Sequence, residues 1–385
     1  MNQNQIVCKL PVLIILLFLS ITFNLFGQFL KIKSSKELSS IEQSEQLISI
    51  NRQMKALITK KQSDDTIAII MIKLDTDKQN IIDMVHAEGE VITRLSVDGN
   101  YVTYGYRDPT SNRFISKVFN ISTGNYIMLE HDIGNAGNPS ISPTTGEILY
   151  EVREKGEAPK VYLSRGDGTP PKFIAYGIGP TWSPDGKWFI LHPVTRKNIH
   201  PRERYLRGKI TREQMIAEIE ETRKKAQRRE PLTPPLTIYD HTGETQIELK
   251  EIGGLAGEVK WSPHAPKLAF RARDRALSNL GLVIIQLYIK SSTIEGYGMR
   301  RISQSGYEPD WSPDGEYLVY TEIKETPDGY NVADKDIYVA KDDGSETQNL
   351  TNTLETFEEH PRWISNAKII FLRENKMVLL ELERQ

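Results

Sequence analysis

A five-residue sequence that returns along the chain constrains its fold more than any other feature. Trp182–Gly186 is WSPDG, and Trp311–Gly315 repeats it letter for letter. Four of the five tryptophans occupy the first position of a copy, which indicates one packing role used repeatedly. The looser copies begin at Leu95, Ile141, Trp261 and Trp363.

Each copy has the composition of a tight turn between two strands. Proline fixes φ at the first turn position, aspartate can bond its own backbone, and glycine takes the positive φ that completes the reversal. Alternating apolar residues follow the copies, as in Lys187–Leu191 and Glu316–Tyr320. A second turn follows later in most units, for example at Asp342–Gly344. One unit therefore predicts two hairpins, or four short strands.

The spacing of the copies predicts the architecture. Successive first positions lie 46, 41, 79, 50 and 52 residues apart, and a four-stranded repeat of roughly 40 to 50 residues is the period of a propeller blade. One blade cannot bury both faces of its sheet, so several must pack radially, with the recurring tryptophan between neighbours. We therefore expect an all-β fold, a six-bladed β-propeller of four-stranded blades.

The motif, its spacing and the strand pattern resemble the TolB-like propeller family over about residues 66–385. The resemblance implies a periplasmic protein whose channel receives an acidic peptide. In TolB a larger α/β domain precedes the propeller, and nothing here corresponds to it, so partner contacts made through that domain are not expected. Blades of this type also occur in peptidases and polysaccharide lyases, so the repeat predicts the fold and not the function.

The N-terminal region is predicted to be exported. Residues 10–27 are almost entirely apolar and uncharged, which predicts a signal peptide or membrane anchor within residues 1–30. The only cysteine, Cys8, precedes this run, which argues against a lipoprotein site and leaves no disulfide. Residues 31–63 are polar with apolar residues at roughly helical spacing, which predicts a helical linker or stalk. The propeller is expected over residues 64–385.

Strands from both ends of the chain are expected to close the ring. Thr66–Leu74 and Asn80–Val85 resemble the outer hairpin of a blade that lacks its inner half. Near the C-terminus, His360–Trp363 and Lys368–Leu372 form an inner pair that lacks a full outer pair. Mixing the two sets would remove exposed strand edges. The division is open, because five strands are available for four places.

The spacing of 79 residues locates one large insertion, about residues 194–231, between the second and third strands of the third repeat-bearing blade. Thr211 and Gln214 form a capping box that predicts a helix. Residues 196–230 contain twelve Lys or Arg and six Glu, a local charge of +6. We expect this helix beside the mouth of the channel, either as a solvated face or as a contact for an anionic partner. Its candidate binding residues are Arg204, Arg207, Arg212, Lys224, Lys225, Arg228 and Arg229.

Aligned repeats place polar residues around the channel mouth. Three residues before the first position of each copy, at the start of an innermost strand, stand Asn138, Gly179, Glu258, Glu308 and His360. Residues near the ends of second strands join them, and the candidate partner-binding set is Asn138, His192, Glu258, Arg271, Glu308 and His360. Glu258, Glu308, His360 and His192 could in principle converge on a cation, but a polar, water-filled mouth is the favoured interpretation, and no metal or other cofactor is expected. The acidic residues Asp334, Asp336 and Asp342–Gly344 are interpreted as turn formers and not as calcium ligands.

No catalytic constellation is predicted. The seven histidines form no HxH or HExxH pattern, there is no GxSxG sequence, and no further domain follows the blades to carry a peptidase nucleophile. The formal charge of −2 does not suggest nucleic-acid binding. We expect an exported, non-enzymatic scaffold that binds an envelope protein or acidic peptide, with acidic glycans or lipid headgroups as further partners of the insertion and membrane contact through residues 10–27 if they are not cleaved. The alternative is a metal-dependent or glycan-active, lyase-like enzyme that uses the same mouth.

Overall fold

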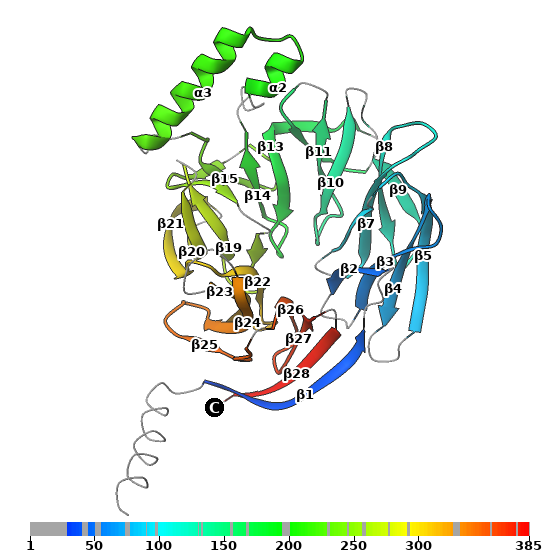
Figure 1. The fold of residues 1–385 in the computed structure, drawn as a ribbon, viewed down its shortest axis with the longest axis vertical. Helices are drawn as coiled ribbons and strands as arrows, with labels where there is room; N and C mark the ends of the chain where they lie inside the picture. The colour runs from blue at the N-terminus through cyan, green and yellow to red at the C-terminus, as the bar shows by residue number, and fades with distance from the viewer. Residues whose placement is uncertain are drawn as a thin grey trace, which may run out of the picture.

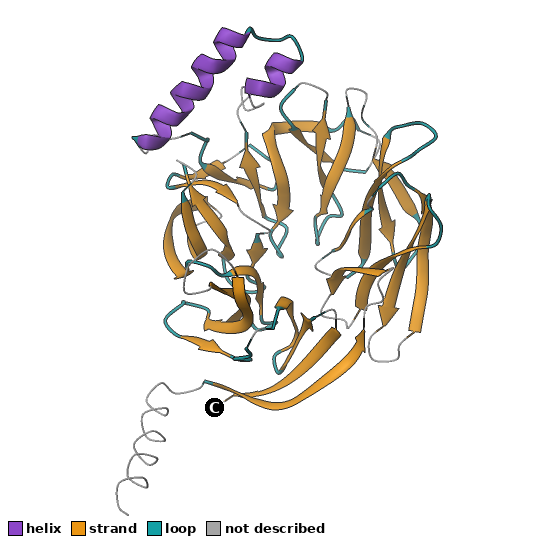
Figure 2. Ribbon diagram, viewed as in Figure 1, coloured by secondary structure: helices purple, strands orange, loops and turns teal. Residues whose placement is uncertain are grey.

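The computed structural model of the chain is a ring of antiparallel sheets around a central opening (Figure 1). It describes residues 29–384, apart from 41–44, 51–54, 74–77, 90, 97–98, 130, 132–133, 155–156, 167–168, 195–200, 229–231, 245, 256–258, 276–277, 291–292, 326–331, 355 and 375. The ring is built almost wholly of strands, with two helices outside it (Figure 2). The β-propeller fold is thus confirmed.

The described strands form seven antiparallel sheets, numbered here 1 to 7, two of which share one long strand. The chain enters sheets 1 to 6 at the innermost strand, whereas sheet 7 also takes its outer strand from the first described strand of the chain (Figure 1). Sheet 1 contains β2 (Glu45–Ile50), β3 (Lys55–Lys61), β4 (Thr66–Lys73) and β5 (Lys78–His86), and sheet 2 contains β6 (Ile92–Leu95), β7 (Tyr101–Arg107), β8 (Phe114–Asn120) and β9 (Tyr126–Leu129). Sheet 3 contains β10 (Asn135–Ile141), β11 (Ile148–Arg153), β12 (Lys160–Ser164) and the first part of β13 (Lys172–Trp182). The second part of β13 is the first strand of sheet 4, which continues with β14 (Trp188–Pro193), β15 (Leu236–Asp240) and β16 (Gln246–Leu249).

In sheet 5 two short segments share the innermost position: β17 (Ile252–Leu255) and β18 (Lys260–Trp261) both pair with β19 (Lys267–Asp274), followed by β20 (Asn279–Lys290) and β21 (Thr293–Ser303). Sheet 6 contains β22 (Tyr307–Trp311), β23 (Tyr317–Glu325), β24 (Val332–Lys341) and β25 (Thr347–Asn349). Sheet 7 contains β26 (Glu358–Ser365), β27 (Lys368–Arg373), β28 (Lys376–Arg384) and, on its outer edge, β1 (Leu30–Ser40).

The ring closes through strands from both ends of the chain, as expected, but through a different strand. β1 pairs antiparallel with β28, from Leu30 opposite Arg384 to Ser40 opposite Lys376. β4 and β5, which we expected to share the closing blade, belong to sheet 1 with β2 and β3. We expected six blades because we counted the copies of the repeat, whereas the described ring has seven sheets. Residues 51–54, between β2 and β3, are NRQM and contain no copy.

The prediction of a helix over residues 31–63 is wrong. β1, β2 and β3 occupy most of this range, so it belongs to the propeller. The physical reason is visible in β3, where the consecutive residues Leu57 and Ile58 are both buried but pack in two different cores on opposite faces of the sheet. A strand covered on both faces loses its polar and apolar alternation, and its apolar residues then imitate helical spacing.

The repeated tryptophans pack as predicted, each against the preceding sheet. Trp311 of sheet 6 shares a core with Leu282 and Ile284 of sheet 5, and Trp363 of sheet 7 shares one with Val319 and Ile337 of sheet 6. The indole N–H of Trp311 also donates to the Lys260 carbonyl oxygen at 2.9 Å. The tryptophan therefore joins two sheets by apolar contact and, in this copy, by a hydrogen bond.

The two complete copies of the repeat form the same turn. In each, the serine hydroxyl donates to the aspartate carboxylate at 2.6 Å, from Ser183 to Asp185 and from Ser312 to Asp314. Gly186 has φ 67°, and a Cβ there would lie 2.1 Å from the Thr144 hydroxyl of the preceding sheet, so the turn requires glycine for its conformation and for its space.

The insertion lies between β14 and β15, the second and third strands of sheet 4, as predicted. It contains α2 (Pro201–Leu206) and α3 (Arg212–Gln227). The capping box is present, because Gln214 N donates to the Thr211 hydroxyl and Thr211 N donates to the Gln214 side chain. None of the helices in the described residues has the length and apolar character needed to cross a membrane. Residues 10–27, predicted as a signal or anchor, lie outside the described part.

Candidate functional site at the mouth of the propeller

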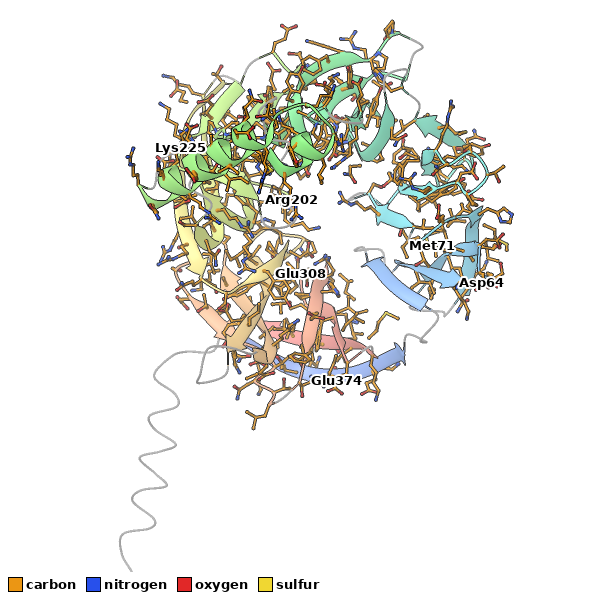
Figure 3. The ribbon with its side chains drawn as sticks, turned by 45° about the horizontal axis from the view of Figure 1, so that its top comes forward. Asp64, Met71, Arg202, Lys225, Glu308 and Glu374 are labelled. Atoms are coloured by element: carbon orange, nitrogen blue, oxygen red, sulfur yellow. The ribbon has the colours of Figure 1, made fainter. Side chains whose placement is uncertain are left out.

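The aligned residues at the starts of the innermost strands share one backbone conformation. Asn138, Gly179, Glu308 and His360 have φ of 47°, 62°, 53° and 57°. Each lies in an irregularity of the pairing between the first and second strands of its sheet. Figure 3 shows Glu308 at the edge of the central opening. Four of the predicted mouth positions are therefore structurally equivalent, and Glu258 lies outside the described residues.

Glu308 and His360 connect sheets 6 and 7. The Glu308 carboxylate accepts the backbone N–H of His360 at 2.9 Å, and its other oxygen lies 2.9 Å from His360 Nδ1. Burial raises the pKa of Glu308, but the hydrogen bonds and charge of His360 outweigh burial and leave the pKa below its ordinary value. The side chains are 27% and 44% exposed, so the pair is open to solvent at the mouth.

A second carboxylate, Glu151 of β11, has the same role between sheets 3 and 4. It accepts the N–H of Gly179 at 2.7 Å and the side-chain amide of Asn138 at 3.0 Å, and it forms an ion pair with Arg153 at 2.7 Å. The sequence analysis did not select Glu151. Its signal was a buried carboxylate inside an otherwise apolar second strand, where an acid needs donors nearby.

The remaining mouth candidates lie at separate places. His192, at the end of β14, is bonded to the backbone of Gly253, and burial lowers its pKa. Arg271 of β19 lies close enough to Tyr307 to act on the pKa of that phenol, which burial and the carboxylates of Glu359 and Glu308 raise. Arg271, Glu308 and His360 thus border one part of the opening, whereas Asn138 lies with Glu151 at another.

Tyr307 and Lys335 complete the polar cluster beside Glu308. The Tyr307 hydroxyl donates to Glu359 at 3.0 Å, and Lys335 forms an ion pair with the same carboxylate. In the part of the chain that the structure describes, no group of three or more His, Cys, Asp or Glu side chains is placed to hold a metal ion. Glu308 and His360 are the two proposed cation ligands that contact each other, and their contact is a hydrogen bond.

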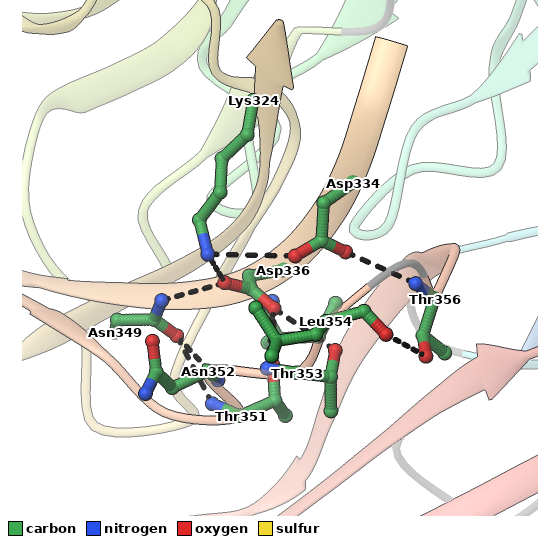
Figure 4. Close-up of polar contacts among 10 residues, drawn as sticks. Lys324, Asp334, Asp336, Asn349, Thr351, Asn352, Thr353, Leu354 and Thr356 are labelled. Carbon is green, nitrogen blue, oxygen red and sulfur yellow. Dashed lines mark hydrogen bonds and ion pairs between the residues drawn. The ribbon is translucent and has the colours of Figure 1, made fainter. Parts of the chain in front are cut away.

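Asp334 and Asp336 are not turn residues, contrary to our interpretation. Both lie in β24 and are buried. Asp336 receives the Asn349 amide at 2.7 Å and both the N–H and hydroxyl of Thr353 at 3.0 Å, and it forms an ion pair with Lys324 (Figure 4). These bonds hold loop 350–357, which leads into β26 beside His360. Asp342–Gly344 does form a turn.

The basic insertion is a helical hairpin in which part of the charge is used internally. Arg204 of α2 forms an ion pair with Glu218 of α3 at 2.7 Å, and Lys225 pairs with Glu221 at 2.8 Å. The candidates Arg207, Arg212, Lys224 and Arg228 are exposed, and Arg229 lies outside the described residues. We expected the helix beside the mouth. In Figure 1, α2 and α3 extend past the outer edge of the ring, whereas in Figure 3 they cross in front of it and Arg202 of α2 lies next to the central opening, so this expectation stays a prediction.

Similar proteins support the fold. No family model matches the sequence, and no curated protein matches it. The chain is similar in structure to an oligogalacturonate lyase in complex with manganese, with a TM-score of 0.55, 12% identity, and coverage of 92% of this chain and 95% of that one. An oligogalacturonate lyase of Vibrio parahaemolyticus gives a TM-score of 0.54 at 10% identity, over 92% of this chain and 98% of that one.

A structure described as putative TolB from Agrobacterium tumefaciens has a TM-score of 0.43 and 13% identity, over 84% of this chain and 100% of that one. At such identities the likeness concerns the arrangement of the sheets alone. Function has to be argued from the mouth and the insertion.

Proposed function

We propose that this chain is an exported propeller scaffold without catalytic activity of its own. It binds a protein or acidic peptide of the cell envelope at the mouth of the ring, and the basic insertion is a second contact surface. One observation carries the proposal: Glu308 and His360 at the mouth, supplied by neighbouring sheets, are already bonded to each other. Polar groups fixed in this way lose little conformational freedom when a partner binds.

The charge at the opening favours an acidic partner. The residue directly before the first position of each copy of the repeat lies on an innermost strand. In three copies this residue is basic, namely Arg94, Lys260 and Arg362. The acidic member of the same series, Asp310, accepts the N–H of Trp363 at 2.9 Å and so belongs to the wall. Arg271 adds a further cation beside Tyr307. Cations around an opening attract and orient acidic segments.

The test is binding of a fluorescent oligoglutamate peptide to the full chain, with oligolysine as the matched peptide. We expect Arg271→Gln combined with Arg362→Gln to weaken oligoglutamate binding about tenfold or more, since each lost charge contact costs about 1 kcal/mol. Arg165→Gln is the control, because Arg165 pairs with Glu147 on an exposed turn. Equal binding of both peptides, or an equal loss in the control, would refute an acidic partner at the mouth.

A lyase-like enzyme is the second candidate, and one observation favours it. The Glu308 carboxylate holds His360 at Nδ1, which leaves Nε2 available for proton transfer at a half-exposed site. Two of the similar structures are oligogalacturonate lyases. Oligogalacturonates incubated with the chain, with and without Mn²⁺, should stay intact if the scaffold proposal holds. Cleavage by the wild type that is lost in His360→Gln would establish the enzyme and overturn the scaffold.

A further inference from the structure

The tip of the helical hairpin, defined here as residues 204–216, presents apolar side chains to solvent. Leu206 is 73% exposed, Ile216 43% and Tyr205 39%. They lie at the end of α2 and in the first turns of α3, and α3 buries none of its residues. These side chains therefore contribute nothing to the core of the ring, and their exposure to water is unfavourable unless something else covers them.

Contacts within the hairpin join its two helices and close the turn between them. Arg204 pairs with Glu218 across the two helices, and the capping box at Thr211 fixes the start of α3. The turn between the helices is closed by the N–H groups of Gly208 and Lys209, which donate to the carbonyls of Tyr205 and Arg204 at 2.9 Å. The apolar side chains are thus presented on a defined projection.

Basic residues lie among the apolar ones in the sequence of the tip. Residues 204–216 contain four Lys or Arg and one Glu. Lys209 and Arg212 are exposed, and Arg204 forms the ion pair with Glu218. Charge complementarity therefore favours an anionic partner. The exposed leucine, isoleucine and tyrosine favour a partner that has an apolar layer directly beneath its charged surface.

We propose that the hairpin tip docks on an anionic membrane surface, with Leu206 and Ile216 at the boundary between headgroups and acyl chains and the basic residues among the headgroups. A bilayer fits this tip better than a folded protein does. A stable protein interface covers about 800 Å² per partner, whereas a fluid surface adapts to a projecting hairpin. Aromatic and aliphatic residues beside Lys and Arg are typical of interfacial insertion.

This inference rests on the proposed function, in which the insertion is a contact surface, and it names the partner of that surface. The experiment that tests it reports on the tip and not on the mouth. Because Cys8 is the only cysteine, a Cys8→Ser chain carrying Leu206→Cys can be labelled at the tip with a polarity-sensitive dye. The dye reports the tip alone, so contacts of residues 10–27 with lipid do not affect it. The same label at the exposed turn residue Ser122 is the matched control.

We expect a blue shift of the tip label with vesicles of phosphatidylglycerol and phosphatidylethanolamine, and none with phosphatidylcholine vesicles or at the Ser122 control. Lys209→Gln with Arg212→Gln should weaken partition about 30-fold, since each basic residue at an anionic surface contributes roughly fivefold. No shift with anionic vesicles would overturn the proposal, as would a shift caused by oligoglutamate alone, which would identify an acidic protein as the occupant. Either failure leaves oligoglutamate binding at the mouth untouched and so separates this inference from the proposed function.

Discussion

At the scale of single residues, carboxylates join neighbouring sheets around the opening. Glu151 accepts the N–H of Gly179, Glu308 accepts that of His360, and Asp310 accepts that of Trp363. Each bond runs from one sheet to the innermost strand of the next. A charged acceptor makes a stronger hydrogen bond than a neutral one, so these carboxylates hold the mouth together. Glu151 does so while buried, whereas Glu308 is also partly exposed.

The Glu308 bond should appear in the pH dependence of stability. The folded-state pKa of Glu308 lies below its ordinary value, so the carboxyl stabilises the fold above the unfolded pKa of about 4.3, and this contribution is lost as the pH falls through the lowered folded value. Glu308→Gln should reduce the free energy of unfolding by about 1 kcal/mol near neutral pH, and the difference from wild type should vanish in acid. Urea unfolding across this pH range measures it.

Glu244→Gln is the control for that series, because Glu244 forms a more exposed pair with Lys172 at the rim. Its effect should stay within about 0.5 kcal/mol at every pH. A Glu308→Gln difference that is constant with pH would contradict the argument.

Residue positions at the mouth could be predicted because the repeat sets the register. Counting three residues back from each first position located Asn138, Gly179, Glu308 and His360, which share a positive φ. Their partners could not be found in this way. Glu151 comes from a second strand, and Tyr307, Lys335 and Glu359 meet across sheets, so only the three-dimensional arrangement brings them together.

At the scale of elements, loop 350–357 shows how a buried acid can fix an exposed segment. Asp336 is fully buried and bonds Thr353, while Asn349 accepts the N–H groups of Thr351 and Asn352 (Figure 4). Leu354 at the tip of the same loop is almost wholly exposed. In the described residues of this loop, side chains of β24 and β25 accept the N–H groups of Thr351, Asn352 and Thr353, which fixes that part of the backbone.

Removing the acid should release the loop. Asp336→Ala leaves the Asn349 amide and the Thr353 N–H without their acceptor, and leaves Lys324 with Asp334 alone. This should cost about 3 kcal/mol of unfolding free energy and expose the loop to chymotrypsin. Asp343→Ala is the matched change, because Asp343 is an exposed turn residue whose hydrogen bonds are local, including that from the N–H of Ser345 at 2.7 Å. An Asp336→Ala protein as stable and as protease-resistant as Asp343→Ala would disprove the role given to Asp336.

The elements themselves were predictable where periodicity or a local signal was present. The capping box of α3 and the place of the insertion between β14 and β15 are confirmed. The strands of residues 30–61 were missed, because β3 is covered on both faces and carries apolar residues in succession. We also interpreted Asp334 and Asp336 wrongly, because neighbouring acidic residues in a sequence usually indicate a turn. The ion pairs with Lys324, which accompany the burial of both acids in a strand, cannot be recognised from the sequence.

At the scale of the whole molecule, the repeat predicted the propeller and its closure by both ends of the chain, and the pairing of β1 with β28 makes the closure explicit. The sheet of β2–β5 escaped the count because it carries no copy of the repeat. The proposed function uses both the mouth and the hairpin.

The central claim is that Glu308 and His360 join sheets 6 and 7 at a binding surface and do not serve as metal ligands. Elemental analysis of the full chain purified without chelator, beside Glu308→Ala and His360→Ala, tests it most directly. We expect no stoichiometric metal in any of the three proteins, and oligoglutamate binding that is unchanged by a chelator. A stoichiometric metal in the wild type that both variants lose would contradict the account and favour the lyase-like enzyme.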